Sequence, residues 1–129
     1  MGAIDTVATW TAPRQQVIAA IATKLGWLVE KTHGGQRAIA FAGDGKYRIL
    51  YTIHSDESLW MPDQNLTDAM EVFVGLWMHC GWLGWAGEWW ASTHPDAFSG
   101  SPFGQSENLL TAIFIAAAQD AGFLNKDNL

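Results

Sequence analysis

A run of tryptophans separated by glycines restricts the fold of this chain more than any other feature. Five of the eight tryptophans lie between Trp77 and Trp90, in the stretch WMHCGWLGWAGEWW. Glycines recur there at positions 81, 84 and 87, a spacing that is costly inside a helix. We therefore expect residues 82–90 to form two short strands joined by a turn at residues 86 and 87. So many indole rings are expected to cover either a core or a ligand.

The composition is that of one compact, soluble domain. The chain has 129 residues, 49% of them hydrophobic, and Cys80 is its only cysteine, so it cannot form an internal disulfide. A formal net charge of -6 argues against a surface that neutralises nucleic-acid phosphates, so direct nucleic-acid binding is not expected. The N-terminus lacks a basic, apolar leader, and the most apolar run, residues 109–118, is too short to span a bilayer. We expect a cytoplasmic protein that does not enter a membrane.

The first half of the chain is expected to form one helix followed by strands. Apolar residues at helical spacing predict a helix that begins near Pro13 and ends at Gly26. Its core face would hold Val17, Ile18, Ile21 and Ala22. Extended segments follow at residues 27–32 and 36–53, and the second is split by a glycine and aspartate turn at residues 42–45. These segments predict an antiparallel sheet.

The segment after this turn alternates in the manner of a half-buried strand. One face would hold Tyr47, Ile49, Tyr51 and Ile53, and the other Lys46, Arg48, Leu50 and Thr52. We expect the face with the aromatic residues to be covered by the rest of the protein. The charged side chains of Arg37, Lys46 and Arg48 would then lie on an open face.

A second helix is expected to begin after Asn65, whose side chain can cap free backbone N–H groups. Asp68 would place a carboxylate in the positive first turn of this helix. Its apolar face would hold Leu66, Ala69, Met70, Phe73 and Trp77. Gly81 would end the helix, so that Trp77 belongs to the core and Cys80 is a buried residue at the helix end.

The last part of the chain is expected to hold a long loop and a third helix. Prolines and glycines in residues 95–105 predict a surface loop, with a short strand near Ala97. A helix capped by Ser106 and ended by Gly122 would follow. This helix is apolar over most of its circumference, which predicts burial on more than one side. The same property makes it the expected contact surface of a homodimer.

The order of these elements predicts an α+β fold, in which an antiparallel β-sheet is packed by about three helices. We expect a single domain over residues 1–129, with an N-terminal arm at residues 1–12 and a long loop at residues 95–105. The sequence contains no evident internal repeat.

Short motifs spread over residues 14–122 resemble those of a known family. They are Leu25-Gly26-Trp27, Trp60-Met61-Pro62, Asp68-Ala69, Trp89-Trp90-Ala91, Ala112-Ile113 and Ala116-Ala117. With this layout, the chain resembles the phage ABA sandwich domain family, small proteins of bacteriophages and prophages with helices packed on a β-sheet. The resemblance implies a phage origin and a setting in the bacterial cytoplasm. It implies no catalytic or binding residues.

The residue patterns of the common enzyme sites are missing from the sequence. None of the four histidines is paired at the i, i+4 spacing of a zinc helix, and there is no phosphate-binding glycine loop, so we expect no metal and no cofactor. A hydrolase would have to rest on His79, Cys80 and His94. His79 and Cys80 are adjacent, and adjacent helix residues do not face one another. We therefore expect a protein that is not an enzyme.

The tryptophan hairpin is the strongest candidate for a binding site. Trp82, Trp85, Trp89 and Trp90 are its candidate residues, and strand alternation predicts that Trp82 and Trp90 oppose Trp85 and Trp89. Three roles stay open for this cluster: an intramolecular core, a protein interface and a small-ligand pocket. In a ligand pocket, Arg37 or Arg48 would bind phosphate.

These observations lead to one main hypothesis and two alternatives. The main hypothesis is a phage-encoded, non-enzymatic protein that binds a host protein and inhibits a bacterial antiviral defence system. The first alternative is a protein that sequesters a nucleotide-like small molecule with its tryptophan hairpin. The second alternative is an uncharacterised hydrolase.

Overall fold

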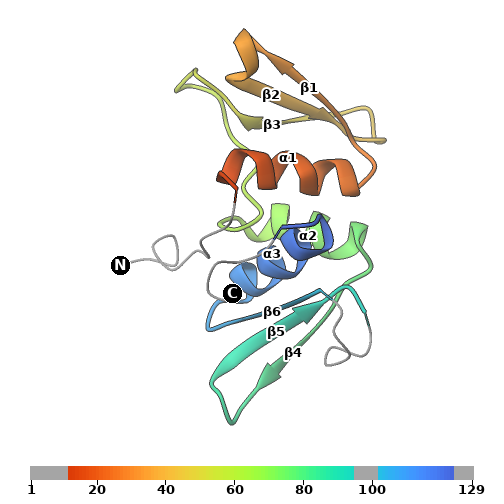
Figure 1. The fold of residues 1–129 in the computed structure, drawn as a ribbon, viewed down its shortest axis with the longest axis vertical. Helices are drawn as coiled ribbons and strands as arrows, with labels where there is room; N and C mark the ends of the chain where they lie inside the picture. Colours follow the sequence, from red (N-terminus) through yellow and green to blue (C-terminus); the bar gives the residue numbers. More distant parts are fainter. Residues whose placement is uncertain (1–11, 95–101, 124–129) are drawn as a thin grey trace.

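Two three-stranded antiparallel sheets lie on opposite sides of a group of helices (Figure 1). The computed structural model describes residues 12–94 and 102–123. In chain order the elements are α1 (Arg14–Lys24), β1 (Leu28–Thr32), a short 3-10 turn η2 (His33–Gly35), β2 (Arg37–Phe41), β3 (Tyr47–Tyr51), α2 (Leu66–Gly75), β4 (His79–Leu83), β5 (Glu88–Ser92), β6 (Phe103–Ser106) and α3 (Leu109–Asp120). The α+β class is confirmed. The strands are divided between sheets β1-β2-β3 and β4-β5-β6.

The order of elements repeats along the chain, although the sequence contains no evident repeat. Both α1 and α2 are followed by a three-stranded meander. Both helices also end in the same way, with a left-handed residue after the last turn, Gly26 after α1 and Trp77 after α2. The next residue then bonds back to the helix, since Trp27 N–H donates to Ala22 and Met78 N–H donates to Phe73. The repeat is therefore one of backbone geometry.

The first helix packs on the first sheet as its spacing predicts. Val17, Ile18, Ile21 and Ala22 are fully buried, which confirms the expected core face of α1. On the sheet they face the small side chains of Ala38 and Ala40 in β2, which are also fully buried. Small residues at this position let the helix approach the strands closely.

The expected faces of β3 were wrong for residues 47–50, and the strand also contains an irregularity at Leu50. Ala38 pairs with Tyr51 and Ile39 with Ile49, which leaves Leu50 as an extra residue in β3. The shift turns both Leu50 and Tyr51 into the core. Arg48, two residues before Leu50, shares its face, lies on the helix side and is largely buried, whereas Tyr47 lies on the outer face and is exposed. The charged face is therefore not the open one.

The end of α2 also differs from the expected one. Asn65 caps the helix as predicted, through a 3.1 Å bond from the Asp68 backbone N–H to its side-chain oxygen. The helix ends at Gly75, however, and Trp77 is 85% exposed rather than part of the core. The left-handed turn at Trp77 breaks the helical period, so that Met78 is the residue that enters the core. Cys80 is correspondingly an exposed residue of β4 and not a buried residue at a helix end.

The third helix is buried on both sides, as its apolar circumference predicts. Residues 111–118 are all buried, with α1 and α2 on one side and β5 and β6 on the other. Asn108 caps it through a 2.8 Å bond from Leu110 N–H, so the cap is not Ser106. The apolar side chains of this helix are not available as the contact surface of a homodimer, because they are covered within the chain itself.

The last strand, β6, lies inside the region that was expected to be a loop. Phe103 and its neighbours up to Ser106 pair with β5 in a regular antiparallel register. Residues 95–101, including the strand expected near Ala97, lie outside the described residues, as do residues 1–11 of the expected N-terminal arm. Gly104 packs directly on the backbone of α3, because a Cβ there would overlap the Ala112 carbonyl oxygen and lie 2.9 Å from the Ala116 nitrogen. A glycine is therefore what allows α3 to sit so close to the sheet.

We expect Gly104→Ala to destabilise the protein by about 2 kcal/mol, because the added methyl group must push α3 away from β6. The control is Gly43→Ala, since a Cβ at position 43 meets open space. Urea denaturation of the two variants and the wild type measures the free energies of unfolding. A Gly104→Ala variant as stable as the Gly43→Ala variant would show that the helix is not in close contact with the sheet.

Candidate functional site

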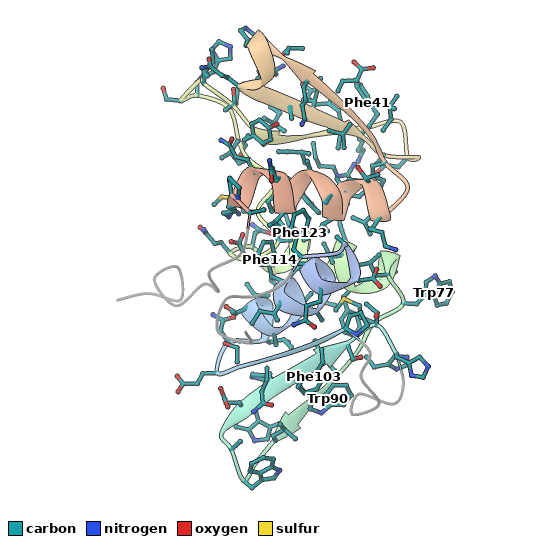
Figure 2. The ribbon with its side chains drawn as sticks, viewed as in Figure 1. Phe41, Trp77, Trp90, Phe103, Phe114 and Phe123 are labelled. Atoms are coloured by element: carbon teal, nitrogen blue, oxygen red, sulfur yellow. The ribbon has the colours of Figure 1, made fainter. Side chains whose placement is uncertain are left out.

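We refer to residues 12–65, which include α1 and the first sheet, as the first unit, and to residues 66–123 as the second unit. Three tryptophans of the second unit project into solvent. Trp77 is 85% exposed, Trp82 is 53% exposed and Trp85 is 84% exposed. They follow β4 along its length: Trp77 precedes the strand, Trp82 lies in it and Trp85 lies in the turn after it. Figure 2 shows Trp77 pointing away from the body of the protein. We refer to Trp77, Trp82 and Trp85 as the tryptophan surface. Large exposed apolar groups of this kind mark sites of interaction more often than isolated apolar residues do.

A fourth tryptophan, Trp89, packs against Trp82 of this surface. Trp82 pairs with Trp89 across the hairpin, and their ring centroids are 5.2 Å apart in an edge-to-face arrangement. Trp89 is half-buried and packs against the core. Directly paired residues of antiparallel strands share a face, so the expectation that Trp82 opposes Trp89 was wrong. The connection at residues 84–87 is two residues longer than the turn expected at residues 86 and 87, and it fixes this pairing.

Trp90 lies on the other face of the same hairpin and has a different role. It pairs with Gly81 in β4, and its indole ring lies across that glycine, since a Cβ there would be 2.5 Å from Trp90 Nε1. Its ring also stacks on Phe103 of β6, with centroids 6.5 Å apart and planes 15° apart (Figure 2). Trp90 therefore covers the outer face of the sheet and joins its three strands.

Two residues of the hydrolase hypothesis, His79 and Cys80, cannot act as a catalytic pair with each other. His79 and Cys80 are consecutive residues of β4, so their side chains point to opposite faces of the sheet. His94 lies beyond the end of β5, and its backbone N–H donates to the Ser92 hydroxyl at 3.1 Å. In the part of the chain that the structure describes, no three His, Cys, Asp or Glu side chains are grouped closely enough to hold a metal.

Arg37 is held by a carboxylate of the first unit. Its guanidinium donates two bonds to Glu57, of 2.9 Å from Nε and 2.6 Å from Nη2, and the Thr52 hydroxyl donates to the same carboxylate. The hydrogen bonds from Arg37 and then Thr52 lower the pKa of Glu57 to about 2, and the bond to Glu57 raises the pKa of Arg37. This pair fastens the loop that follows β3 to the start of β2.

Arg48 is also engaged, and it borders an open pocket of about 490 Å³. Its guanidinium donates to Glu71 of α2 and to Asp44 of the β2–β3 turn, and the bond to Glu71 is the main reason that the pKa of Arg48 is raised. The same group lies 4.9 Å from the centre of the Trp27 ring. Glu71 accepts a further bond from the buried Trp60 indole. The sequence did not indicate Trp27 or Glu71 as site residues, since no local motif links them to Arg48.

The structure does not bring the two arginines together with the tryptophan hairpin. Arg37 and Arg48 belong to the first sheet, whereas Trp82 and Trp89 belong to the second sheet, and the helices lie between them (Figure 1). A single ligand cannot be held by an arginine of one sheet and an indole of the other. The predicted residues therefore form two separate places on the molecule.

The two units differ strongly in charge, a sequence signal that bears directly on the tryptophan surface. Residues 66–123 contain no lysine or arginine and six carboxylates, which are Asp68, Glu71, Glu88, Asp96, Glu107 and Asp120. Residues 12–65 contain six basic and five acidic side chains, so they are nearly neutral. Two of the six carboxylates are bonded to bases of the first unit, Glu71 to Arg48 and Asp120 to Lys24. The tryptophan surface thus lies in an acidic unit without basic side chains of its own.

Comparisons of the chain with protein-family models, with curated proteins and with solved structures found no match. A functional argument must therefore rest on the residues themselves. Among the helices of the described residues, none combines the length and the apolar character that crossing a membrane requires.

Replacing Glu57 by glutamine should remove a pH-dependent part of the stability. Because the pKa of Glu57 falls from its ordinary 4.5 to about 2 on folding, its contribution is fully present above pH 4.5 and is lost as the pH falls towards 2. The wild type should therefore be more stable than Glu57→Gln at pH 6, and this difference should shrink between pH 4.5 and 2. Denaturation at a series of pH values measures it. The stability difference between the wild type and Asp56→Asn, a change at the exposed neighbour, should not vary with pH in this range, and a variation as large as that of Glu57→Gln would contradict the assignment to Glu57.

Proposed function

We propose that this protein acts by binding another protein through the tryptophan surface. Trp77 is the observation that carries the proposal. Each of the three helices ends with a left-handed residue, and in two of them that residue is glycine, Gly26 at φ 86° and Gly122 at φ 98°. In the third it is Trp77 at φ 54°. A side chain with a Cβ in this conformation costs about 1 kcal/mol or more compared with glycine.

The contacts of Trp77 with the described residues do not offset this strain. The Trp77 side chain is 85% exposed, so it buries little surface that would compensate for the backbone conformation. Strained conformations of this kind are found at functional sites more often than elsewhere. Tryptophan is also the residue type most enriched among the residues that dominate the energy of protein interfaces. An indole that costs stability and faces solvent is therefore well explained as a contact for a partner.

The rest of the surface has the order that an interface needs. Trp82 is held by its edge-to-face contact with Trp89, which is itself anchored in the core. A side chain that is already fixed loses less entropy when a partner binds. Trp85 extends the same set of aromatic groups to the tip of the hairpin. Each of the three offers an exposed indole along β4, in a unit that has no lysine or arginine.

The family resemblance directs the search for the partner. Because the sequence motifs resemble those of phage ABA sandwich proteins, we propose that the partner is a protein of a bacterial host. A component of an antiviral defence system is the target that such a setting favours. The tryptophan surface supports binding in general, and only the resemblance supports this particular target.

Trp77→Gly should separate stability from function. We expect the variant to be more stable than the wild type by about 1 kcal/mol, because glycine adopts the left-handed conformation without strain. We also expect it to capture less of the partner from a bacterial lysate, measured by quantitative mass spectrometry.

Trp82→Ala combined with Trp85→Ala should reduce capture of the same partner. Tyr47→Ala, a 60% exposed aromatic on the outer face of the first sheet, is the control and should capture as the wild type does. Equal capture by all of these variants would refute the proposal.

The pocket beside Arg48 supports a second candidate function, the binding of a small molecule. It is bordered by Trp27 on the apolar side and by Arg48 and Glu71 on the polar side. A nucleotide would have to displace Asp44 from Arg48, because both ends of the guanidinium are already bonded. The turn that carries Asp44 is exposed and contains two glycines, which leaves room for this exchange.

We expect a nucleotide that enters this pocket to quench the fluorescence of Trp27, and Trp27→Phe to abolish that quenching. The double variant Trp82→Ala, Trp85→Ala is the control and should keep it. The quenching is measured by titrating the wild type with a panel of nucleoside mono-, di- and triphosphates. Fluorescence that is unchanged across the panel would eliminate this candidate.

A further inference from the structure

We infer that the partner contributes an extended, basic segment that pairs with β4 as a fourth strand of the second sheet. The inference rests on the proposed function, since it uses the same surface, and it names the chemistry of the partner. Three observations carry it: the open edge of β4, the position of Trp82 on that edge and the charge of the unit.

The edge of β4 is open, whereas the edges of the first sheet are protected. β4 is the outer strand in the order β4-β5-β6, and its sequence, His79-Cys80-Gly81-Trp82-Leu83, contains no Asp, Glu, Lys, Arg or Pro. At one edge of the first sheet, β1 carries Glu30 and Lys31. At the other edge, Leu59 bridges to Ile49 of β3, and Trp60 N–H donates to the Ile49 carbonyl at 2.8 Å. Charges and covering segments are the usual protection against added strands, and β4 has neither among residues 12–94 and 102–123.

The backbone of β4 also has the regularity that pairing requires. It pairs with β5 over five consecutive residues without a register shift, in contrast to the irregular pairing of β2 with β3. The backbone groups on its outer side therefore repeat in register, and another extended chain can replace the water on the whole row at once. Backbone pairing alone gives little sequence preference, so the side chains must select the partner.

Trp82 and Trp85 define which side chains can meet this edge. Trp82 is on the outermost strand, 53% exposed, and Trp85 follows at the tip of the hairpin, 84% exposed. In a strand added beside β4, every second side chain would lie on the same face as Trp82. Those side chains would come within reach of an indole ring, which attracts a guanidinium or an ammonium group.

The charge of the second unit also favours a basic segment. Residues 66–123 carry six carboxylates and no lysine or arginine, and four carboxylates remain when Glu71 and Asp120, which are bonded to Arg48 and Lys24, are set aside, so a basic segment is attracted and an acidic one is repelled. A second copy of this chain would bring an equal negative charge to the edge, and β4 itself contains no lysine or arginine to place over Trp82. Nucleic acid would be repelled for the same reason. A basic strand from another protein is the occupant that agrees with both the edge and the charge.

The probe for this inference is a seven-residue peptide in which arginine alternates with valine, with both ends blocked. Its control is the same peptide with glutamate in place of arginine. We expect the arginine peptide to quench tryptophan fluorescence and to protect the amides of residues 79–83 from hydrogen exchange, because those amides lie in the strand that it joins. The glutamate peptide should do neither. Raising the salt concentration should weaken the binding, since charge attraction contributes to it.

Variants then connect the peptide to the surface. Trp82→Ala should weaken binding of the arginine peptide by roughly tenfold, the scale of losing one interfacial tryptophan contact. Cys80→Lys should weaken it as well, because a base on the edge repels the peptide and protects the strand. Leu28→Ala, an exposed apolar residue on the edge strand of the first sheet, is the matched control and should leave binding unchanged. Circular dichroism spectra of the variants establish that each one is folded.

The outcomes separate this inference from the proposed function. If the arginine peptide does not bind, or binds without protecting residues 79–83, the inference is overturned. Its failure leaves the proposed function in place if Trp82→Ala with Trp85→Ala still reduces capture of a host protein. Equal binding of the arginine and glutamate peptides would overturn the charge selection. A wild-type protein that forms dimers through β4, seen as protection of residues 79–83 that increases with protein concentration, would assign the edge to a second copy and overturn the inference.

Discussion

The close packing of α3 between the two sheets is the constraint on which the rest of the structure depends. Residues 111–118 are buried all round, because β5 and β6 pack on one side of the helix and α1 and α2 on the other. Gly104 sets the distance on one side, because only a residue without a Cβ lets β6 contact the helix backbone. On the other side, α1 and α2 complete the enclosure and connect the helix to the first sheet. The second sheet is thereby held at a fixed position, with β4 left beyond the helix as an outer strand.

Features with a strong local signal could be predicted from the sequence. The core face of α1, the Asn65 cap, the β2–β3 turn and the burial of α3 each follow from spacing or from a single well-placed residue. The failures arise where the backbone departs from a regular period. In β3 the alternation of Tyr47 to Leu50 could be predicted but not which face is covered, and the extra residue at Leu50 places Leu50 and Tyr51 in the core together. A left-handed turn at Trp77 moved Met78 into the core. β6 was missed because its contact with α3 is made by a glycine, which carries no hydrophobic signal.

The candidate site divides along similar lines. The tryptophan hairpin could be located from composition and glycine spacing, and its division into a supported pair, Trp82 and Trp89, and a separate ring, Trp90, depended on a connection whose length the sequence did not fix. The arginines could be identified as candidates but not placed, since their partners, Glu57 and Glu71, are about 20 positions away along the chain. The absence of lysine and arginine from residues 66–123 can be read from the sequence alone.

Residues 12–65 carry one more basic than acidic side chain, whereas residues 66–123 carry six carboxylates and no lysine or arginine, two of these carboxylates being bonded to Arg48 and Lys24 of the first unit. Figure 1 shows the two sheets at opposite ends of the molecule. A positively charged partner would therefore encounter the second unit more often than a neutral partner of the same size would. The asymmetry would thus act mainly on the rate of encounter, whereas the indole contacts would act on how long the complex lasts.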